Sequence, residues 1–178
     1  MLFTDRLRHE TKISHQGVDA HPFISEIRKS PNQAIKYMLF NECCIHNIQQ
    51  TLDMSDNKPL ESLLFRDCTS DQCMRLLYCD CPEWVELLQA CRDYPMEHAY
   101  MFYLGLLAGG NMLRRYIPNS YQHLLEFGED GTDNYSRKII TEFKNYLNSK
   151  ITDTISQEAF INRVQQSFQL ISKCFDKL

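Results

Sequence analysis

The sequence has no surplus of positive charge. Its 178 residues contain 19 lysines and arginines against 23 aspartates and glutamates, which gives a net charge of −4. Proteins that bind nucleic acid mainly through its phosphates normally present a basic surface, so this balance argues against nucleic acid as a partner. With 43% hydrophobic and 24% charged residues, the chain has the composition of one compact domain, residues 1–178, with a sizeable core.

Long apolar runs are absent as well. The N-terminus is charged from its fifth residue, so it lacks the uninterrupted apolar segment of a secretory signal. The longest apolar stretch runs from Ala99 to about Met112. This stretch is too short to span a bilayer and is rich in glycine. We therefore expect a cytoplasmic protein without a transmembrane segment.

The cysteines do not form paired CxxC hooks, although five of the eight fall between residues 68 and 91. Structural zinc sites normally combine two such hooks, so no structural zinc is expected. Without an export signal, the thiols are expected to be reduced and mostly buried. The eight residues are Cys43, Cys44, Cys68, Cys73, Cys79, Cys81, Cys91 and Cys174.

Strand-like alternation of apolar and polar residues is also missing. Apolar residues recur with helical spacing along nearly the whole chain, which predicts an all-α domain. Several helix starts are marked by proline or a capping residue: Pro31 after Ser30, then Pro82, Pro95 and Asp133. The expected helices cover residues 4–19, 31–53, 83–93, 95 to about 117, 135–150 and a C-terminal segment with an apolar stripe of Phe160, Val164, Phe168, Ile171 and Phe175.

Three glycines interrupt the helical segment HAYMFYLGLLAGGNMLRR, residues 98–115. Each costs about 1 kcal/mol relative to alanine inside a helix. Gly105, Ala108, Gly109 and Met112 follow i, i+3, i+4 and i+7, so they share one face of nearly bare backbone. Two interpretations stay open at this point. In the first, the glycines are structural: another helix packs closely against them, or the helix breaks at Gly109 and Gly110. In the second, a flat ligand lies against the backbone.

The first predicted helix carries a polar stripe. Arg8, Lys12, His15 and Asp19 follow i, i+4, i+7 and i+11 along it. A solvated face explains the two cations alone. The order of the four residues favours a metal site instead, because a carboxylate one turn after a histidine can hold the second nitrogen of its ring.

Together these stretches resemble the heme oxygenase family. LRHETKISHQGVDAHPFI, residues 7–24, is similar to the family's proximal helix, and residues 98–115 are similar to its distal helix. Further on, LLEFGED and EFKNYLNS are similar to its aromatic loop and following basic helix. The resemblance is collinear over nearly the whole chain. It implies a single-domain multi-helix bundle with heme between the first helix and a kinked, glycine-rich distal helix.

The resemblance also implies a role for individual residues. His15 would be the axial ligand of the heme iron, with Asp19 beside its outer nitrogen. The residues expected at the heme propionates and their polar rim are Arg8, Lys12, Lys144, Tyr100 and Asn148. Asn148 occupies the position where the family has an arginine, and Lys150 is close to it in the sequence. Gly105 and Gly109 would make room for the macrocycle and for a small ligand on its iron.

The chain departs from the family pattern on the distal helix. An acidic residue that anchors proton-delivering waters usually follows the first glycine of the motif, and here that position is Leu106. Phe102 stands where arginine is common. Because leucine cannot bind a water by hydrogen bonding, backbone carbonyls or Asn111 would have to deliver protons. The expected catalytic group is therefore Gly105, Leu106, Gly109 and Asn111.

Three functions follow as alternatives. The leading one is a heme oxygenase that converts heme to biliverdin, carbon monoxide and ferrous iron with O2 and electrons from a ferredoxin or a flavin reductase. The second is a non-enzymatic heme carrier, sensor or sink, which Leu106 and Phe102 favour. The third is a bundle of the same architecture that binds no heme, such as a partner-binding protein or a relative of the thiamin-degrading enzymes.

Overall fold

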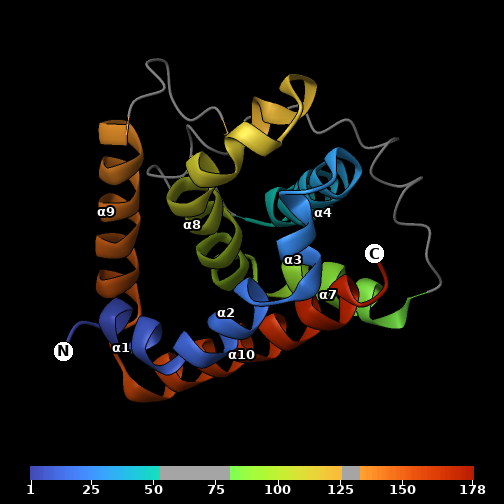
Figure 1. The fold of residues 1–178 in the computed structure, drawn as a ribbon. Helices are drawn as coiled ribbons and strands as arrows, with labels where there is room; N and C mark the ends of the chain where they lie inside the picture. Colours follow the sequence, from blue (N-terminus) through green and yellow to red (C-terminus); the bar gives the residue numbers. More distant parts are fainter. Residues whose placement is uncertain (53–80, 126–132) are drawn as a thin grey trace.

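The computed structural model describes residues 1–52, 81–125 and 133–178 (Figure 1). Every regular element within these ranges is helical, which confirms the all-α prediction. In chain order the elements are α1 (Phe3–Glu10), α2 (Lys12–Asp19), α3 (Pro22–Ile27), α4 (Pro31–Gln49), α7 (Pro82–Asp93), α8 (Pro95–Leu113), the 3-10 helices η1 (Arg114–Tyr116) and η2 (Asn119–Leu125), α9 (Asp133–Lys150) and α10 (Thr154–Phe175).

Proline fixes the start of several helices. Pro31, Pro82 and Pro95 occupy the first turn of α4, α7 and α8, as predicted. A proline at this position loses no hydrogen bond, since the N–H groups of the first turn have no partner within the helix. Ser30 lies at the N-cap of α4 without a side-chain capping bond. Pro22 opens α3, a short helix that the sequence reading did not single out.

The single helix predicted over residues 4–19 is wrong in one respect, because the chain forms two helices that meet at Thr11. The hydroxyl of Thr11 donates to the Leu7 carbonyl at 2.7 Å, a carbonyl that also accepts from the Thr11 N–H at 3.0 Å. Such a side-chain bond back to the preceding turn competes with the helical ladder and bends a helix. The Thr11 carbonyl still accepts from the N–H of His15 at 3.0 Å, so the two segments remain joined.

The glycine-bearing helix α8 lies in the middle of the bundle. It packs against α4, α7, α9 and α10, and Figure 1 shows it between α9 and α4. Residues 95–113 form one continuous helix, so the predicted alternative of a break at Gly109 and Gly110 is wrong. Because α8 touches helices on several sides, most of its apolar side chains are buried.

The last helix, α10, runs along the base of the molecule with α1 and α2 laid over it (Figure 1). The stripe predicted for it is confirmed, since all five of its residues are buried: Phe160, Val164, Phe168, Ile171 and Phe175. This stripe positions α2, which carries His15, against the core through the contacts between α2 and α10.

Two side-chain contacts tie α8 to α10. The His98 ring is fully buried, its Nδ1 donates to the Tyr94 carbonyl at 2.8 Å, and its Nε2 accepts from the Ser167 hydroxyl at 2.8 Å. Directly beside it, the buried Glu97 carboxylate pairs with Arg163 Nη1 at 2.8 Å. The first half of α8 is therefore anchored by two adjacent residues.

We expect the His98 contact to make stability depend on pH. Burial lowers the pKa of His98, against a smaller raising effect of its bond to Tyr94. The unfolded state, with a histidine pKa near 6.5, therefore binds the proton first. The stabilisation is fully present above about pH 6.5 and is lost as the pH falls toward the lower pKa of the folded state.

Urea unfolding at pH 7.5 and 5.5 measures this effect. A His98→Gln variant is expected to be less stable at pH 7.5 by about 1–3 kcal/mol, because Ser167 and the Tyr94 carbonyl lose their partner. Its stability is also expected to change less between the two pH values than that of the unmodified protein. An equal change in both proteins would show that other groups cause the acid sensitivity.

The cysteines of the described ranges are buried, in agreement with the predicted buried thiols, and no two of them form a disulfide: Cys43, Cys44, Cys81, Cys91 and Cys174. Burial raises the pKa of Cys44 well above its usual value and that of Cys174 to about 12. Cys68, Cys73 and Cys79 lie outside the described residues. Within the described part of the chain, no three histidine, cysteine or acidic side chains are placed to hold a metal ion. No helix there is long and apolar enough to cross a bilayer.

Candidate functional site

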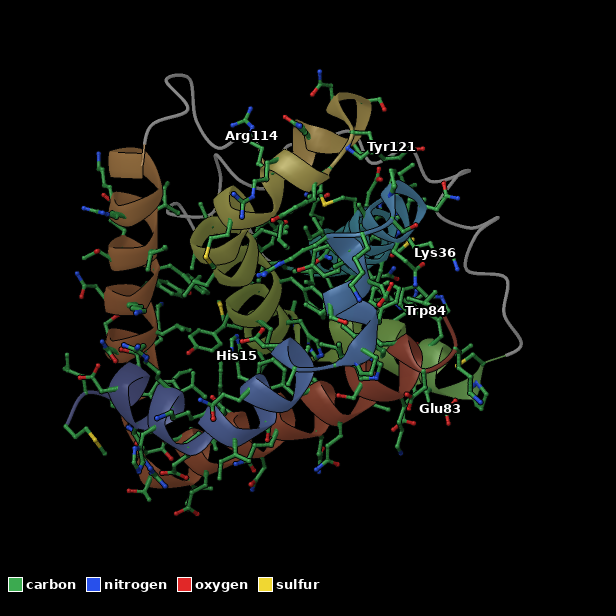
Figure 2. All side chains as sticks on the ribbon, in the orientation of Figure 1. His15, Lys36, Glu83, Trp84, Arg114 and Tyr121 are labelled. Carbon is green, nitrogen blue, oxygen red and sulfur yellow. The ribbon has the colours of Figure 1, made fainter. Side chains whose placement is uncertain are left out.

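His15 and Asp19 form a hydrogen-bonded pair on α2. Nδ1 of His15 lies 3.0 Å from Oδ2 of Asp19, one helical turn later, as the spacing predicted. The two side chains are 54% and 64% exposed. A neutral imidazole that donates from Nδ1 to a carboxylate keeps the Nε2 lone pair available. His15 can therefore serve as a metal ligand through Nε2, and Figure 2 shows it on the side of α2 that faces α8.

A buried aromatic ring supports the same imidazole from α10. The rings of His15 and Phe168 meet edge to face, with centroids 5.4 Å apart and planes at 89°. Phe168 is only 8% exposed. The sequence predicted Phe168 in the buried stripe but not this contact. His15 and Phe168 are far apart in the sequence, and helical periodicity does not show contacts between distant helices.

The glycines of α8 differ in what surrounds them. Among the described residues, no heavy atom lies within 4 Å of a Cβ atom built on Gly105 or Gly109, apart from the backbone of the helix itself. A Cβ atom on Gly110 would instead come within 2.7 Å of Leu125 Cδ2. Close packing therefore explains Gly110, whereas Gly105 and Gly109 border open space. Met112, on the same face, is 69% exposed.

Three of the predicted cations are available for an anion. Arg8 and Lys12 are exposed on α1 and α2, and Lys144 is half-buried on α9. None of the three forms an ion pair with the described residues, in contrast to Arg6, which binds Glu10 at 2.6 Å. Lysine and arginine without partners provide charge-assisted hydrogen bonds to a carboxylate.

Tyr100 places a hydroxyl from α8 near one of these cations, Arg8. Burial raises the pKa of Tyr100, and the nearby Arg8 guanidinium opposes this shift. The tyrosine ring also meets Phe160 of α10 at a steep angle, with centroids 6.4 Å apart. The Tyr100 side chain therefore has Arg8 of α1 near its hydroxyl and Phe160 of α10 beside its ring.

Asn148 has a structural role that the sequence did not predict. Its Oδ1 accepts from the backbone N–H of Thr4 at 2.9 Å, and its Nδ2 donates to the Thr4 hydroxyl at 3.2 Å. The amide therefore ties α9 to the start of α1. Lys150 Nζ lies 5.6 Å from the centroid of the Tyr146 ring.

The distal positions that departed from the family pattern are apolar core. Leu106 is 2% exposed and Phe102 is 5% exposed. The Phe102 ring lies 6.2 Å from that of Phe40 on α4 and is stacked on His98 at 6.4 Å. Neither side chain can hold a proton or bind a water by hydrogen bonding. The side chain of Asn111, the other expected relay residue, lies outside the described part of the structure.

The chain is similar to known proteins in its structure. No family model and no curated protein matches the sequence. Heme oxygenase-1 from the cyanobacterium Synechocystis, solved in complex with heme, matches with a TM-score of 0.68 and 18% identity over 100% of this chain and 92% of its own. The heme oxygenase from Leptospira interrogans matches with a TM-score of 0.66 and 17% identity over 100% of both chains.

Heme oxygenase-2 from Synechocystis, solved in complex with heme and NO, matches with a TM-score of 0.75 and 17% identity over 99% of this chain and 84% of its own. The chain has the heme oxygenase fold. This match confirms the fold expected from the two motif segments. Within the heme oxygenase fold, the residues singled out on the first and distal helices lie on α1, α2 and α8.

Proposed function

We propose that this chain binds heme between α2 and α8 and cleaves it oxidatively to biliverdin, carbon monoxide and ferrous iron. The observation that carries the proposal is the open, side-chain-free face of α8 at Gly105 and Gly109. In this fold the two Synechocystis relatives were solved with heme. A flat macrocycle is the ligand that such a face fits, because no side chain projects from the helix at Gly105 or Gly109.

The residues present fit the chemical groups of heme. His15 offers Nε2 for axial ligation, with Asp19 holding Nδ1 at 3.0 Å. The groups available to the two propionates are the cations without ion pairs and the neighbouring hydroxyl: Arg8, Lys12, Lys144 and Tyr100. Because Asn148 already binds Thr4 with both ends of its amide, we assign the propionates to these cations rather than to Asn148.

Each residue then has a defined task. Bound heme supplies a redox-active iron and, as the substrate, the carbon skeleton that is opened with O2 and electrons from a ferredoxin or a flavin reductase. Asp19 fixes the tautomer of His15, which leaves the Nε2 lone pair for the iron. Gly105 and Gly109 keep side chains away from the macrocycle and leave room for a diatomic molecule. The cations orient the propionates and so set the rotation of the macrocycle.

Absorbance spectroscopy tests the proposal directly. Titration of the protein with hemin is expected to give a Soret band that saturates at one hemin per chain. Addition of reductant in air is then expected to remove this band and to produce the broad red absorbance of a bilin. A titration with no change beyond free hemin would overturn heme binding, and a complex that stays intact under reductant and air would overturn cleavage.

A second function is favoured by the apolar packing of Leu106 and Phe102. Positioned proton donors contribute about 10²–10⁴-fold to rates, and neither side chain is one. A chain that binds heme through His15 without proton delivery from these positions would act as a heme carrier, sensor or sink. Its complex would survive reduction in air.

Leu106→Asp distinguishes the two functions. A carboxylate at this position can hold a proton and anchor water, so we expect bilin formation to become at least about 10-fold faster. The protein is expected to lose stability, because the position is 2% exposed and a carboxylate is costly to bury. Initial rates of Soret loss in Leu106→Asp are compared with those of Leu106→Met, the apolar control. Equal rates at equal hemin affinity would show that protons reach the site by another route.

A further inference from the structure

We infer that Phe168, on α10, is a positioning residue that fixes the plane of the His15 imidazole. The inference rests on the proposed function in so far as His15 is the axial ligand. It assigns a task to a residue that lies outside the stretches that carry the motif resemblance. It also explains how a ligand on an exposed helix keeps one orientation.

The His15 side chain needs such a support because it is 54% exposed. An exposed imidazole on a helix exchanges between rotamers unless its neighbours hold it. The hydrogen bond to Asp19 fixes the position of Nδ1, but the ring can still turn about that point. Asp19 is itself 64% exposed, so this hydrogen bond alone does not tie the imidazole to the core.

The contact with Phe168 supplies the second constraint. The two rings meet at 89° with centroids 5.4 Å apart, which is the edge-to-face arrangement that aromatic rings prefer. An imidazole that turned about Nδ1 would lose this geometry. The hydrogen bond and the ring contact together therefore select one plane for the imidazole.

Phe168 can act as a fixed support because its own surroundings are rigid. It is 8% exposed and belongs to the buried stripe of α10. The preceding residue, Ser167, donates to the fully buried His98 at 2.8 Å. Helix α10 also packs against α2 directly. The core therefore supplies one of the two contacts that orient His15.

The plane of an axial imidazole matters to the metal that it binds. Groups that orient a ligating histidine change the electronic properties of the bound metal as well as the affinity of the site for it. A fixed plane gives a low-spin ferric complex one set of EPR g values, whereas a distribution of planes broadens or splits them. The expected consequence of Phe168 is spectroscopic, and it is separate from any catalytic rate.

The first arm of the test uses the protein without heme. The ring protons of His15, assigned by their absence in His15→Gln, are expected to show NMR cross-peaks to the Phe168 ring. In Phe168→Leu these protons are expected to shift and to show averaging between rotamers, while Phe168→Tyr keeps the unmodified pattern. Unchanged His15 signals in Phe168→Leu would overturn the inference.

Phe160→Leu is the matched control. Phe160 belongs to the same stripe, is 3% exposed and makes an edge-to-face contact with Phe3 at 5.3 Å. Its replacement removes a similar amount of core packing far from the His15 ring. Thermal unfolding shows that both leucine variants are folded. If Phe160→Leu changed the His15 signals as much as Phe168→Leu, the effect would be one of general packing and the inference would be wrong.

The second arm uses the ferric hemin complex with cyanide. Phe168→Leu is expected to broaden or split the g values, and Phe168→Tyr and Phe160→Leu are expected to keep one sharp set. Sharp, unmodified g values in Phe168→Leu would overturn the inference. If hemin does not bind at all, the proposed function fails, and the NMR arm still decides whether Phe168 orients His15.

Discussion

His15→Ala is expected to lose the imidazole-ligated spectrum of the hemin complex. Without Nε2 the iron has no axial base from α2, so the Soret band should shift and the affinity for hemin should fall. Loss of groups that only support a ligating histidine costs about 10–100-fold in metal affinity, and we expect loss of the ligand itself to cost at least as much. Titration with hemin, followed by absorbance and EPR, measures both effects.

The matched control for His15→Ala is His9→Ala, an exposed histidine on α1. This variant should bind hemin like the unmodified protein. Added imidazole should restore a histidine-like spectrum to His15→Ala, because the small molecule can occupy the space that the side chain leaves. Asp19→Asn should give an intermediate loss, since the ring keeps Nε2 but its Nδ1 loses the charged partner at 3.0 Å. Identical spectra in His15→Ala and the unmodified protein would rule out His15 as the ligand.

Gly105→Ala and Gly109→Ala are expected to change stability and hemin affinity in opposite directions. Their new Cβ atoms meet none of the described residues within 4 Å, so alanine should stabilise the heme-free protein by up to about 1 kcal/mol at each position. The same methyl groups occupy the space assigned to the macrocycle. Affinity for hemin should therefore fall, and Gly109→Leu should reduce it by at least about 100-fold, because an overpacked contact of this size costs several kcal/mol.

Gly17→Ala separates the two effects. Gly17 also lies inside a helix, and none of the described residues comes within 4 Å of its Cβ position. It is two residues from His15, so it does not share the face of that ring. It should gain similar stability and keep the hemin affinity of the unmodified protein. Urea unfolding without heme and fluorescence quenching on hemin addition give the two measurements. If all three alanine variants bind hemin normally, the open face of α8 is not the heme site.

Local patterns predicted the features that local interactions control. Pro31, Pro82 and Pro95 lie at helix starts because the missing N–H costs nothing there. The pairing of His15 with Asp19 followed from helical spacing alone, since residues four apart are neighbours on a helix.

Features that depend on distant segments were not predictable in this way. The periodicity of α8 showed that its glycines share a face, but only the packed structure shows that Gly110 is crowded by Leu125 while Gly105 and Gly109 are open. The bond between Thr4 and Asn148 joins residues that are 144 positions apart in the sequence. The break at Thr11 results from a hydroxyl bond that helical periodicity cannot reveal.

Buried histidines show the same limit. In the sequence His98 resembled any other histidine of the chain, yet its ring is fully enclosed and bonded at both nitrogens. The residues next to His98 in the sequence do not indicate Ser167 as its partner, because Ser167 lies on another helix, α10. The contact of His15 with Phe168 is hidden for the same reason.

The buried sulfur atoms have a practical consequence. Because burial raises its pKa to about 12, Cys174 is almost entirely protonated at pH 7, and it is the thiolate that attacks alkylating reagents and peroxides. Cys44 is held in the protonated state by the same enclosure. These two side chains can therefore be modified only after the helices around them separate. The rate of their labelling then reports the spontaneous opening of the core.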